Sequence, residues 1–542
     1  MESTLQIFGH MTRNRPLMRV VVAYGLFTVS EYAVWIAMLV YAYDQGGATT
    51  AGLVLVAQLL PAAVVAPLVA PSGDRRSPVF LLAGGYAVQG VAAAATSALL
   101  FVDASPYLAY LGAVVVSTAI TTTRPAQAAL LPALTREVKE LTAANFAIGW
   151  VESLSIMLAG AVVGLILTFG TVAHVVASAA VLLGAALLLV LPLRVSSLGR
   201  RVVSGTPPGA SSSVKAILRD QPVRLLVGLL GAEYVVIGAL DVLFVVLAID
   251  MLNAGEAWVG YLNMAYGAGG VMLGLAAVLV GRRLGPVILF TAVMLGVALA
   301  VSAIAAVPGF VILLLAVVGG NRALFDVASR ALLQRAIPSD QIARVFGLAE
   351  GLSMAGIAAG AMLAPALVAL GGGPLGLVVV AALLPGIVLS RARLLLRLDQ
   401  HAQVPVVEIA LLQSLPIFRI LPPQALEGLA RALEPVRFDA GRALVREGEE
   451  GDSYFAIAEG HVDVQRAGKT IVTLHRGDGL GEIALLRTGR RTATAIASTP
   501  VKAFRLDRDS FLTAVNGHVP TLQSAIELVH DTEVRDTRRD PP

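Results

Sequence analysis

The chain has 542 residues, of which 57% are hydrophobic and 14% are charged, and its formal net charge at pH 7 is +4. Soluble domains average roughly 45–50% apolar residues, so the composition argues against a wholly soluble protein. No cysteine is present, which excludes a disulfide framework and a cysteine-ligated metal site. Charged residues are concentrated in 398–542, whereas 1–397 consists of long apolar stretches, so we expect the chain to occupy two environments.

The positions of lysine and arginine predict a membrane topology. Both residue types are absent from 20–74, 77–123, 140–193, 225–281, 284–321 and 345–390. A membrane-spanning helix needs about 20 apolar residues, so each of these segments has room for two crossings and a turn. By the positive-inside rule, the basic residues between the segments are cytoplasmic. We therefore expect twelve helices in the inner (plasma) membrane with both termini in the cytoplasm, and no nucleic-acid partner for the basic residues.

Short motifs recur about 200 residues apart. The recurring pairs are Ser30–Val34 with Ala232–Val236, Ala129–Leu131 with Ala331–Leu333, and Val151–Ser155 with Ala349–Ser353. Several pairs at a nearly common offset predict two six-helix halves, at 1–193 and 221–397. A polar, serine- and proline-containing segment at 194–220 is expected to be the cytoplasmic linker between them.

The first 397 residues resemble the major facilitator superfamily of transporters, in particular its drug-, macrolide- and siderophore-efflux branches. The segments that carry the likeness are Arg124–Pro132, Leu141–Asn145, Ile337–Asp340 and Arg344–Leu348. The resemblance implies a secondary transporter that moves a small molecule across the lipid bilayer, with export as the expected direction.

Five carboxylates fall inside the predicted helices: Glu31, Glu152, Glu233, Asp241 and Glu350. A charge in a spanning segment costs several kcal/mol unless it faces a cavity or a partner. In an apolar cavity a carboxylate binds and releases a proton closer to neutral pH. We therefore expect these groups to couple transport to protons or to recognise a cationic or polar substrate. The alternative, strongest for Glu152 and Glu350, is a hydrogen bond to a neighbouring helix near the membrane surface.

Two further sets of charges are candidates for a cytoplasmic gate. Asp74-Arg75-Arg76 matches the superfamily's signature between helices 2 and 3, although Ala70 and Ser77 replace glycines expected around it. The resemblance implies that Asp74 and Arg75 latch the cytoplasmic side, whereas a simple topogenic cluster would only set orientation. Arg124 and Asp326 occupy equivalent repeat positions with opposite charge, and they either form a gate pair or lie separately at the cytoplasmic ends.

The glycine-rich segments favour close helix packing over ligand binding. They are Gly267, Gly269 and Gly270 in one helix and Gly347, Gly351, Gly356 and Gly360 in another. No strand precedes them, so an ATP-binding loop is not expected. No selectivity-filter motif or arginine-rich voltage helix indicates a channel. No nucleophile–base arrangement indicates an enzyme, so we expect no catalytic residue, no metal and no cofactor.

Residues 409–535 follow a connector at 398–408 and are expected to form a cytoplasmic α+β domain. Helical periodicity from Ile409 to Ala430 is interrupted at Pro416 and Pro422-Pro423. Six strands are predicted after it: Ala443–Arg446, Tyr454–Ala458, Val462–Gln465, Ile471–Leu474, Thr494–Ala497 and Val501–Leu506. A final helix is expected to begin at Asp507 or Asp509 and to include Leu522–Val529. The predicted order is helix, β-roll, helix.

This domain resembles the cyclic nucleotide-binding module of catabolite activator proteins, cyclic-nucleotide-dependent kinases and cyclic-nucleotide-modulated channels. The matching motifs are Gly448–Ile457, Gly477–Glu482 and Arg491-Thr492-Ala493. Glu482 offers an acceptor for a ribose 2′-hydroxyl, and Arg491 offers a guanidinium for a phosphate. The backbone N–H groups that follow Glu482 can form a one-turn helix start, which is an anion site.

The resemblance implies roles for six more residues. Gly481, Ile483 and Ala484 would make close backbone contacts, Thr492 would bond the phosphate or a guanine amine, and Val472 and Leu474 would form the apolar wall beneath the base. We expect cAMP in preference to cGMP as the regulatory ligand. The alternative is a degenerate β-roll that binds no ligand, which would predict loss of Glu482 or Arg491, and both are present.

The sequence thus predicts a secondary transporter regulated by a cytoplasmic cyclic nucleotide. Its expected partners are that nucleotide, a small-molecule substrate and the bilayer. The alternative is a membrane-anchored nucleotide sensor or scaffold whose facilitator-like part does not transport.

Overall fold

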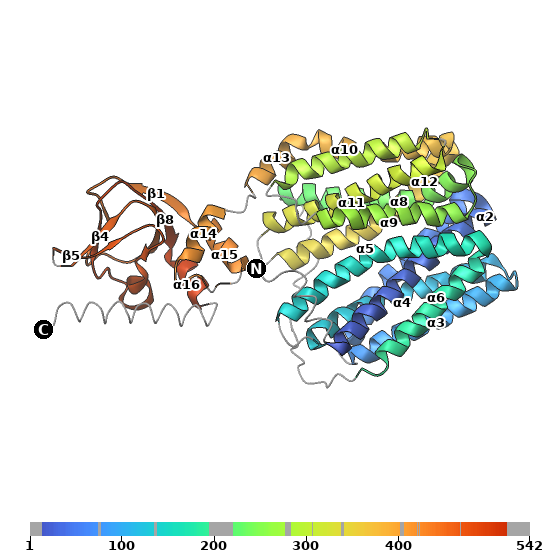
Figure 1. The fold of residues 1–542 in the computed structure, drawn as a ribbon, viewed down its shortest axis with the longest axis horizontal. Helices are drawn as coiled ribbons and strands as arrows, with labels where there is room; N and C mark the ends of the chain where they lie inside the picture. The colour runs from blue at the N-terminus through green and yellow to red at the C-terminus, as the bar shows by residue number, and fades with distance from the viewer. Residues whose placement is uncertain are drawn as a thin grey trace. The chain divides into compact units, whose positions relative to one another are not determined.

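The computed structural model describes residues 14–73, 77–134, 138–193, 220–276, 283–305, 307–337, 341–401, 406–419, 421, 423–466 and 468–516. Asp74-Arg75-Arg76, nearly all of the predicted linker and the predicted Leu522–Val529 helix lie outside these residues. The chain divides into two compact units, Met1–Ala402 and Gln403–Pro542, the first helical and the second rich in strands (Figure 1). Both classes of structure agree with the sequence prediction.

The first unit is built from long helices. They are α2 (Arg15–Gly73), α3 (Pro78–Phe101), α4 (Pro106–Leu134), α5 (Val138–Phe169), α6 (Val172–Val190), α8 (Gln221–Val246), the π-helix η1 (Leu247–Met251), α9 (Ala257–Ala276), α10 (Leu284–Ser302), α11 (Pro308–Ala336), α12 (Ile342–Ser390) and α13 (Ala392–His401). Gly47 in α2 and Gly372 in α12 have φ values of 66° and 73°, in the left-handed region. Each glycine interrupts its helix, so α2 and α12 each consist of two consecutive rods.

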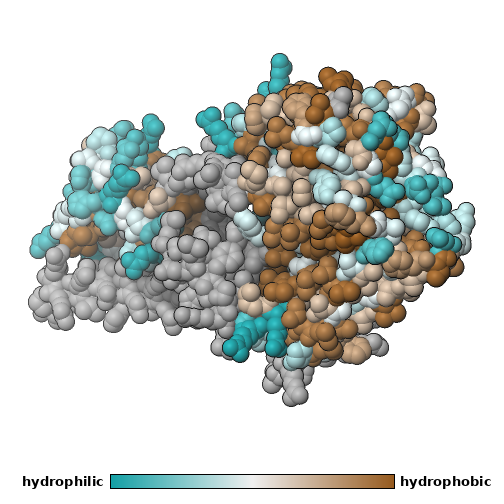
Figure 2. Space-filling model, turned by 45° about the vertical axis from the view of Figure 1, so that its right-hand side comes forward, coloured by the Kyte–Doolittle hydropathy of each residue, from teal (hydrophilic) through white to brown (hydrophobic). Residues whose placement is uncertain are grey.

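Among the described residues, nine helices are long and apolar enough to cross a membrane. Many of their apolar side chains face outward, as the hydrophobic surface of the helical unit in Figure 2 shows. Tyr107, Phe169 and Ile304 are 81%, 86% and 83% exposed, respectively. Exposed apolar surface on this scale is unusual for a soluble monomer. The predicted number of twelve crossings stays a prediction.

Small residues allow several helices to pack backbone against backbone. A Cβ atom added at Gly260 of α9 would lie 2.2 Å from the backbone nitrogen of Gly164 in α5. A Cβ atom at Gly52 of α2 would lie 2.4 Å from the carbonyl oxygen of Ala361 in α12. These distances leave no room for a side chain, so glycine is required for the close approach.

The glycine prediction is confirmed at some positions and wrong at others. Added Cβ atoms at Gly267, Gly269 and Gly360 would lie within 2.5 Å of the backbone of a neighbouring helix. Gly347 and Gly351, by contrast, are exposed and meet nothing within 4 Å. Their spacing matches that of the packed glycines, but the first turns of α12 carry them on an open face.

The second unit is a β-roll flanked by short helices. Its elements are α14 (Val406–Ser414), α15 (Pro423–Arg431), β1 (Glu434–Phe438), β2 (Ala443–Val445), β3 (Ser453–Glu459), β4 (Val462–Arg466), β5 (Lys469–Leu474), β6 (Gly479–Leu480), the π-helix η3 (Ala484–Thr488), β7 (Thr494–Ala497), β8 (Val501–Asp507) and α16 (Arg508–Asn516). The strands form two four-stranded antiparallel sheets, ordered β1-β8-β3-β6 and β2-β7-β4-β5.

All six predicted strands are observed, and the structure adds β1 and β6. The sequence of β1 contains a proline and two charged residues, so its pattern does not alternate clearly. It is nevertheless a strand because five of its residues pair with β8. The two residues of β6 pair with β3 and begin the segment that leads to the candidate site.

An aromatic cluster joins the helices of the second unit to its sheets. Phe418, Tyr454 and Phe511 are buried, with ring centroids 5.6 Å apart for Phe418 and Tyr454 and 5.2 Å apart for Tyr454 and Phe511. Such ring pairs stabilise a core beyond the area that they bury. The cluster therefore connects α16 and the segment after α14 to β3.

Replacing Gly260 by alanine should destabilise the helical unit, because the added methyl group would force α5 and α9 apart. We expect a loss of about 1–3 kcal/mol, the usual cost of overpacking. The measurement is thermal unfolding of the purified protein. Gly184→Ala is the matched control, since an added Cβ there meets nothing within 4 Å. Equal melting temperatures for the two variants would contradict the close packing.

Candidate functional site

The segment after β6 brings a glycine against an arginine from the far end of the same loop. Gly481 has a φ value of 107°, which L-residues rarely adopt. A Cβ atom added there would lie 2.6 Å from Nη1 of Arg491 and 2.8 Å from the carbonyl oxygen of Ser453. Both the backbone angle and the available space therefore require glycine at this position.

Glu482 begins the short helical turn that continues into η3. Gly489, with a φ value of 71°, ends that turn and donates its N–H to the carbonyl of Ala484 at 2.9 Å. The Glu482 side chain is 9% exposed, and its Oε2 has no hydrogen-bond partner among the described residues. Burial raises the pKa of Glu482, because it disfavours the charged carboxylate.

Arg491 is fixed by its backbone and its side chain. Its N–H donates to the carbonyl of Glu449 at 2.8 Å, and its carbonyl accepts from the N–H of Gly448 at 2.9 Å. The guanidinium is buried, and Nη2 donates to the carbonyl of Ser453 at 2.8 Å. Its Nη1 has no hydrogen-bond partner in the described part of the chain. Burial lowers the pKa of Arg491, because the charged form loses hydration.

The site therefore holds two buried groups of opposite charge, each with an unused hydrogen-bonding atom. An unsatisfied buried polar atom costs roughly 1–3 kcal/mol, and more when the group is charged. A ligand that carries both an anion and a hydroxyl donor would satisfy Arg491 and Glu482 together. The adjoining helical turn adds backbone N–H groups of the kind that bind phosphates.

The sequence interpretation did not assign a role to Asp452. Its carboxylate lies 3.5 Å from Nη2 of Arg491 and 3.6 Å from Nη2 of Arg505, and it accepts a hydrogen bond from Ser453 Oγ at 2.8 Å. Among the described residues, Asp452 is therefore the carboxylate that pairs with Arg491. The signal was available, since Asp452 lies inside the Gly448–Ile457 motif.

The other predicted residues lie on neighbouring elements. Ala484 is buried against Gly451, where an added Cβ would lie 2.5 Å from the Ala484 Cβ. Ile483 is half-buried beside it, and the carbonyl of Thr492 accepts from Arg466 Nε at 3.2 Å. Val472 on β5 is 45% exposed, whereas Leu474 packs partly into the core between the sheets. Val472 thus offers apolar surface, while Leu474 is largely used by the fold.

The helical unit contains a second group of predicted residues, clustered around Arg124. Nη2 of this arginine donates to both oxygens of Glu31 at 3.2 Å, and Nη1 lies 3.5 Å from Glu152. The three residues come from α4, α2 and α5, respectively. Arg124 therefore bridges helices within the first predicted half.

The charges around Glu233 in α8 are less completely paired than those around Arg124. Its side chain is fully buried, Nη1 of Arg322 lies 3.7 Å from Oε1, and neither carboxylate oxygen has a hydrogen-bond partner among the described residues. The Arg322 guanidinium also lies over the ring of Tyr266, 5.9 Å from its centroid. Arg322 was missed in the sequence interpretation as a site residue, although it is the first charged residue after the apolar N-terminal half of α11.

Arg124 and Asp326 bind different partners in this structure and do not pair with each other. Asp326 accepts from Arg330 Nε at 2.8 Å, and Arg330 also donates to the Tyr234 hydroxyl at 3.0 Å. Of the remaining predicted residues, Asp241 accepts from Trp35 Nε1 at 3.2 Å, which joins α8 to α2, and Glu350 is exposed on α12.

Comparisons with known proteins bear on the second unit. Residues 435–518 match the sequence model of the cyclic nucleotide-binding domain family. A cGMP-dependent protein kinase of Eimeria tenella is 38% identical over 129 residues, which cover 23% of this chain and 13% of the kinase. The acetyltransferase Pat of Mycolicibacterium smegmatis is 39% identical over 123 residues, covering 22% of this chain and 36% of that protein.

A cAMP-dependent protein kinase regulatory subunit of Schizosaccharomyces pombe is 31% identical over 138 residues, covering 24% of this chain and 34% of that protein. Among solved structures, PKAR CBD2 with bound Sp-2Cl-cAMPS aligns with 27% identity and a TM-score of 0.22, covering 24% of this chain and 88% of that one. The chain spans between 13% and 36% of the length of these three curated relatives. The family match lies on the segment that carries Glu482 and Arg491, and the C-terminal unit is a cyclic nucleotide-binding domain.

Proposed function

We propose that this chain is a secondary membrane transporter, an exporter of a small molecule and not an enzyme, whose activity is regulated by a cytoplasmic cyclic nucleotide. The observation that carries the proposal is the presence, in one chain, of a cyclic nucleotide-binding domain and a helical unit with an apolar surface and buried charges. We place the helical unit in the inner membrane with both termini in the cytoplasm, where cyclic nucleotides are made.

Helix count supports the membrane assignment. Two of the nine apolar spans, Arg15–Pro61 and Arg344–Ser390, are 47 residues long, roughly 70 Å at the helical rise and more than twice the thickness of the bilayer core. Each contains a Gly-Gly break, so each can cross twice. Counted in this way, the nine spans among the described residues supply eleven crossings, and α9, which is not one of the nine, supplies the twelfth that the proposal needs.

Helix packing supports the two-half repeat. A shift of about 200 residues along the chain relates two pairs of glycines. Gly160 of α5 corresponds to Gly360 of α12, which is next to Ala361, and Gly52 of α2 corresponds to Gly260 of α9. The two pairs of helices pack in the same way: α5 approaches α9 at Gly160 and Gly260, and α2 approaches α12 at Gly52 and Ala361. Equivalent contacts at equivalent positions are what two related halves would produce.

The buried charges support transport. Each predicted half places a carboxylate of its first helix next to an arginine of its fourth, Glu31 with Arg124 and Glu233 with Arg322. Charged groups inside a membrane bundle are costly, and they usually mark an ion or substrate route. We propose that Glu31 and Glu233 carry the coupling protons, and that Asp241 and Trp35 line the route between the halves.

Nucleotide control requires that the ligand bind two states of the carrier unequally. We propose cAMP as the ligand, in line with the sequence expectation and with the similarity to the cAMP-dependent protein kinase regulatory subunit of Schizosaccharomyces pombe. Glu482 would hold the ribose hydroxyl and Arg491 the phosphate, with release of Asp452 from the guanidinium when the phosphate enters.

The last helix before the nucleotide-binding unit supports a route for this control. Asp399 of α13 is 3% exposed and accepts the N–H of Leu284, at the start of α10, at 2.9 Å. A Cβ atom added at Gly285 would lie 3.0 Å from the Asp399 Cβ, so the two helices are in tight contact. We propose that α13 transmits the state of the nucleotide domain to α10 through this carboxylate cap.

Replacing Arg491 by glutamine should weaken cAMP binding about 100-fold, or about 3 kcal/mol, because the phosphate loses its buried charged partner. The measurement is calorimetric titration of the full-length protein in nanodiscs with cAMP and, separately, with cGMP. Arg490→Gln is the matched control, since Arg490 is exposed on the same loop. Unchanged affinity in the Arg491 variant would rule out the proposed phosphate site.

Replacing Glu31 and Glu233 by glutamine should abolish proton-driven flux, because glutamine cannot release a proton. The measurement is movement of ethidium, followed by fluorescence in inside-out vesicles with an imposed pH gradient, with and without cAMP. The wild-type protein should transport, and its rate should change with cAMP. Equal wild-type rates without cAMP and at saturating cAMP would disprove nucleotide control. If the wild-type protein moved neither ethidium nor any other small molecule tried, the sensor or scaffold alternative would be favoured.

Replacing Asp399 by alanine should leave cAMP affinity unchanged but reduce the effect of cAMP on flux at least by half, since α10 loses the cap that ties it to α13. The expected loss of the capping hydrogen bond is about 1 kcal/mol. Gln400→Ala, an exposed neighbour on the same helix, is the control. A cAMP effect of wild-type size in the Asp399 variant would exclude this route.

A further inference from the structure

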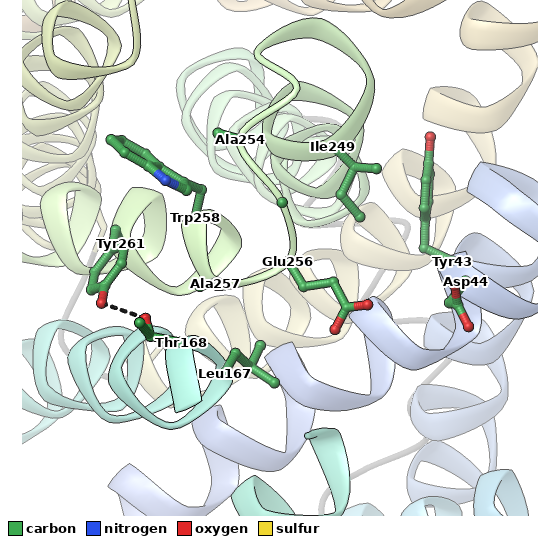
Figure 3. Close-up of a pocket in the computed structure, with 11 residues that line it drawn as sticks. Tyr43, Asp44, Leu167, Thr168, Ile249, Ala254, Glu256, Ala257, Trp258 and Tyr261 are labelled. Atoms are coloured by element: carbon green, nitrogen blue, oxygen red, sulfur yellow. Dashed lines mark hydrogen bonds between the residues drawn. The ribbon is translucent and has the colours of Figure 1, made fainter. Parts of the chain in front are cut away.

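An open cavity of about 950 Å³ lies at the ends of helices in the first unit, apart from the charge clusters around Arg124 and Glu233. Its walls come from α2, α5, η1, the connector that follows η1, and α9 (Figure 3). In terms of the predicted repeat, α2 and α5 belong to the first half and the other elements to the second. Both predicted halves therefore contribute walls to the cavity.

The charged residues that line this cavity are all acidic. Asp44 of α2 and Glu256 of the connector line it, and the lining contains no lysine, arginine or histidine. In Figure 3 the Glu256 carboxylate points into the space between the α2 side and the α9 side. Both acidic residues are exposed, and the pKa of Glu256 is raised by partial desolvation and by the proximity of Asp44. Two carboxylates with no basic side chain in the lining favour a positively charged ligand in the cavity.

Three aromatic rings also line the cavity: Tyr43, Trp258 and Tyr261. In Figure 3, Tyr43 lies beside Asp44, whereas Trp258 and Tyr261 lie on the α9 side. Trp258 and Tyr261 pack edge to face with centroids 6.0 Å apart, and the Tyr261 hydroxyl lies 2.9 Å from Thr168 Oγ. The Tyr43 hydroxyl donates to the carboxylate of Asp250 in η1. Because two of the rings are tied by hydrogen bonds and the third packs against one of them, their faces are held in place without a ligand.

We propose that this cavity binds an organic cation, namely an amine, a guanidinium or a quaternary ammonium group with an attached aromatic or alkyl body. Carboxylates supply the opposite charge, and aromatic faces attract desolvated cations. The volume lies at the upper end of the range for small-molecule pockets. A bare metal ion would want several oxygen ligands at close range, whereas most of this lining is aromatic or apolar.

The cavity is separated from the α13–α10 contact by the length of α9, whose 20 residues span roughly 30 Å. If the α13–α10 contact is cytoplasmic, the cavity faces the opposite side of the membrane. A role for this cavity in binding the substrate during transport rests on the proposed function, whereas binding of an organic cation in the cavity does not.

The test measures binding rather than flux. Full-length protein in nanodiscs is titrated calorimetrically with benzyltrimethylammonium and with phenylmethanesulfonate, which share a benzyl group and carry opposite charges. Saturable binding of the cation alone is expected. Glu256→Gln should weaken it about fivefold, as expected for a partly exposed charge contact. Trp258→Leu should weaken it by a similar factor of about five, and Trp258→Phe should retain most of it.

Asp103→Asn is the matched control, because it removes a carboxylate from the α3–α4 turn, which does not line the cavity. Its affinity for the cation should equal that of the wild type. Absence of saturable cation binding, equal binding of the anion, or equal loss in the Asp103 variant would overturn the proposal. Cation binding without any flux would leave the cavity assignment standing and count against the transporter instead, so the two failures are distinguishable.

Discussion

Burial of charge without a complete set of partners is the physical constraint on which both units depend. Such burial costs several kcal/mol, and a fold retains it only where surrounding structure holds the group in place. Counting partners among the described residues, Glu482 and Arg491 in the second unit each keep one polar atom without a hydrogen bond, and Glu233 in the first unit keeps two. These side chains are held by tight backbone contacts around Gly481 and by interhelical packing around Glu233, so the fold keeps them in place.

Glycine provides much of that holding structure, in two different ways. At Gly481, Gly47 and Gly372 it supplies a backbone conformation that other residues rarely adopt. At Gly160 and Gly260 it supplies space, so that α5 and α9 meet backbone to backbone.

The connection between the two units is short in sequence. Only a few residues separate α13, which is capped onto α10 by Asp399, from α14, the first helix of the nucleotide-binding domain. A buried carboxylate that caps a helix is a stiff attachment, because its loss exposes an N–H group that has no other acceptor within the helix. The proposed control of a carrier by a nucleotide would therefore act through α13, whose attachment to α10 is stiff.

The sequence by itself determined the division into an apolar and a polar unit, the six strands with clear alternation, and the Glu482 and Arg491 pair, because periodicity and local motifs carry those features. It did not reveal β1, which is a strand because of its pairing with β8, or the role of Asp452, which depends on where β3 places it. It also could not select the partners of Arg124, or bring Asp44 and Glu256 to one aromatic-lined cavity. Those features join residues from 28 to more than 200 positions apart, and only tertiary packing decides which distant side chains meet.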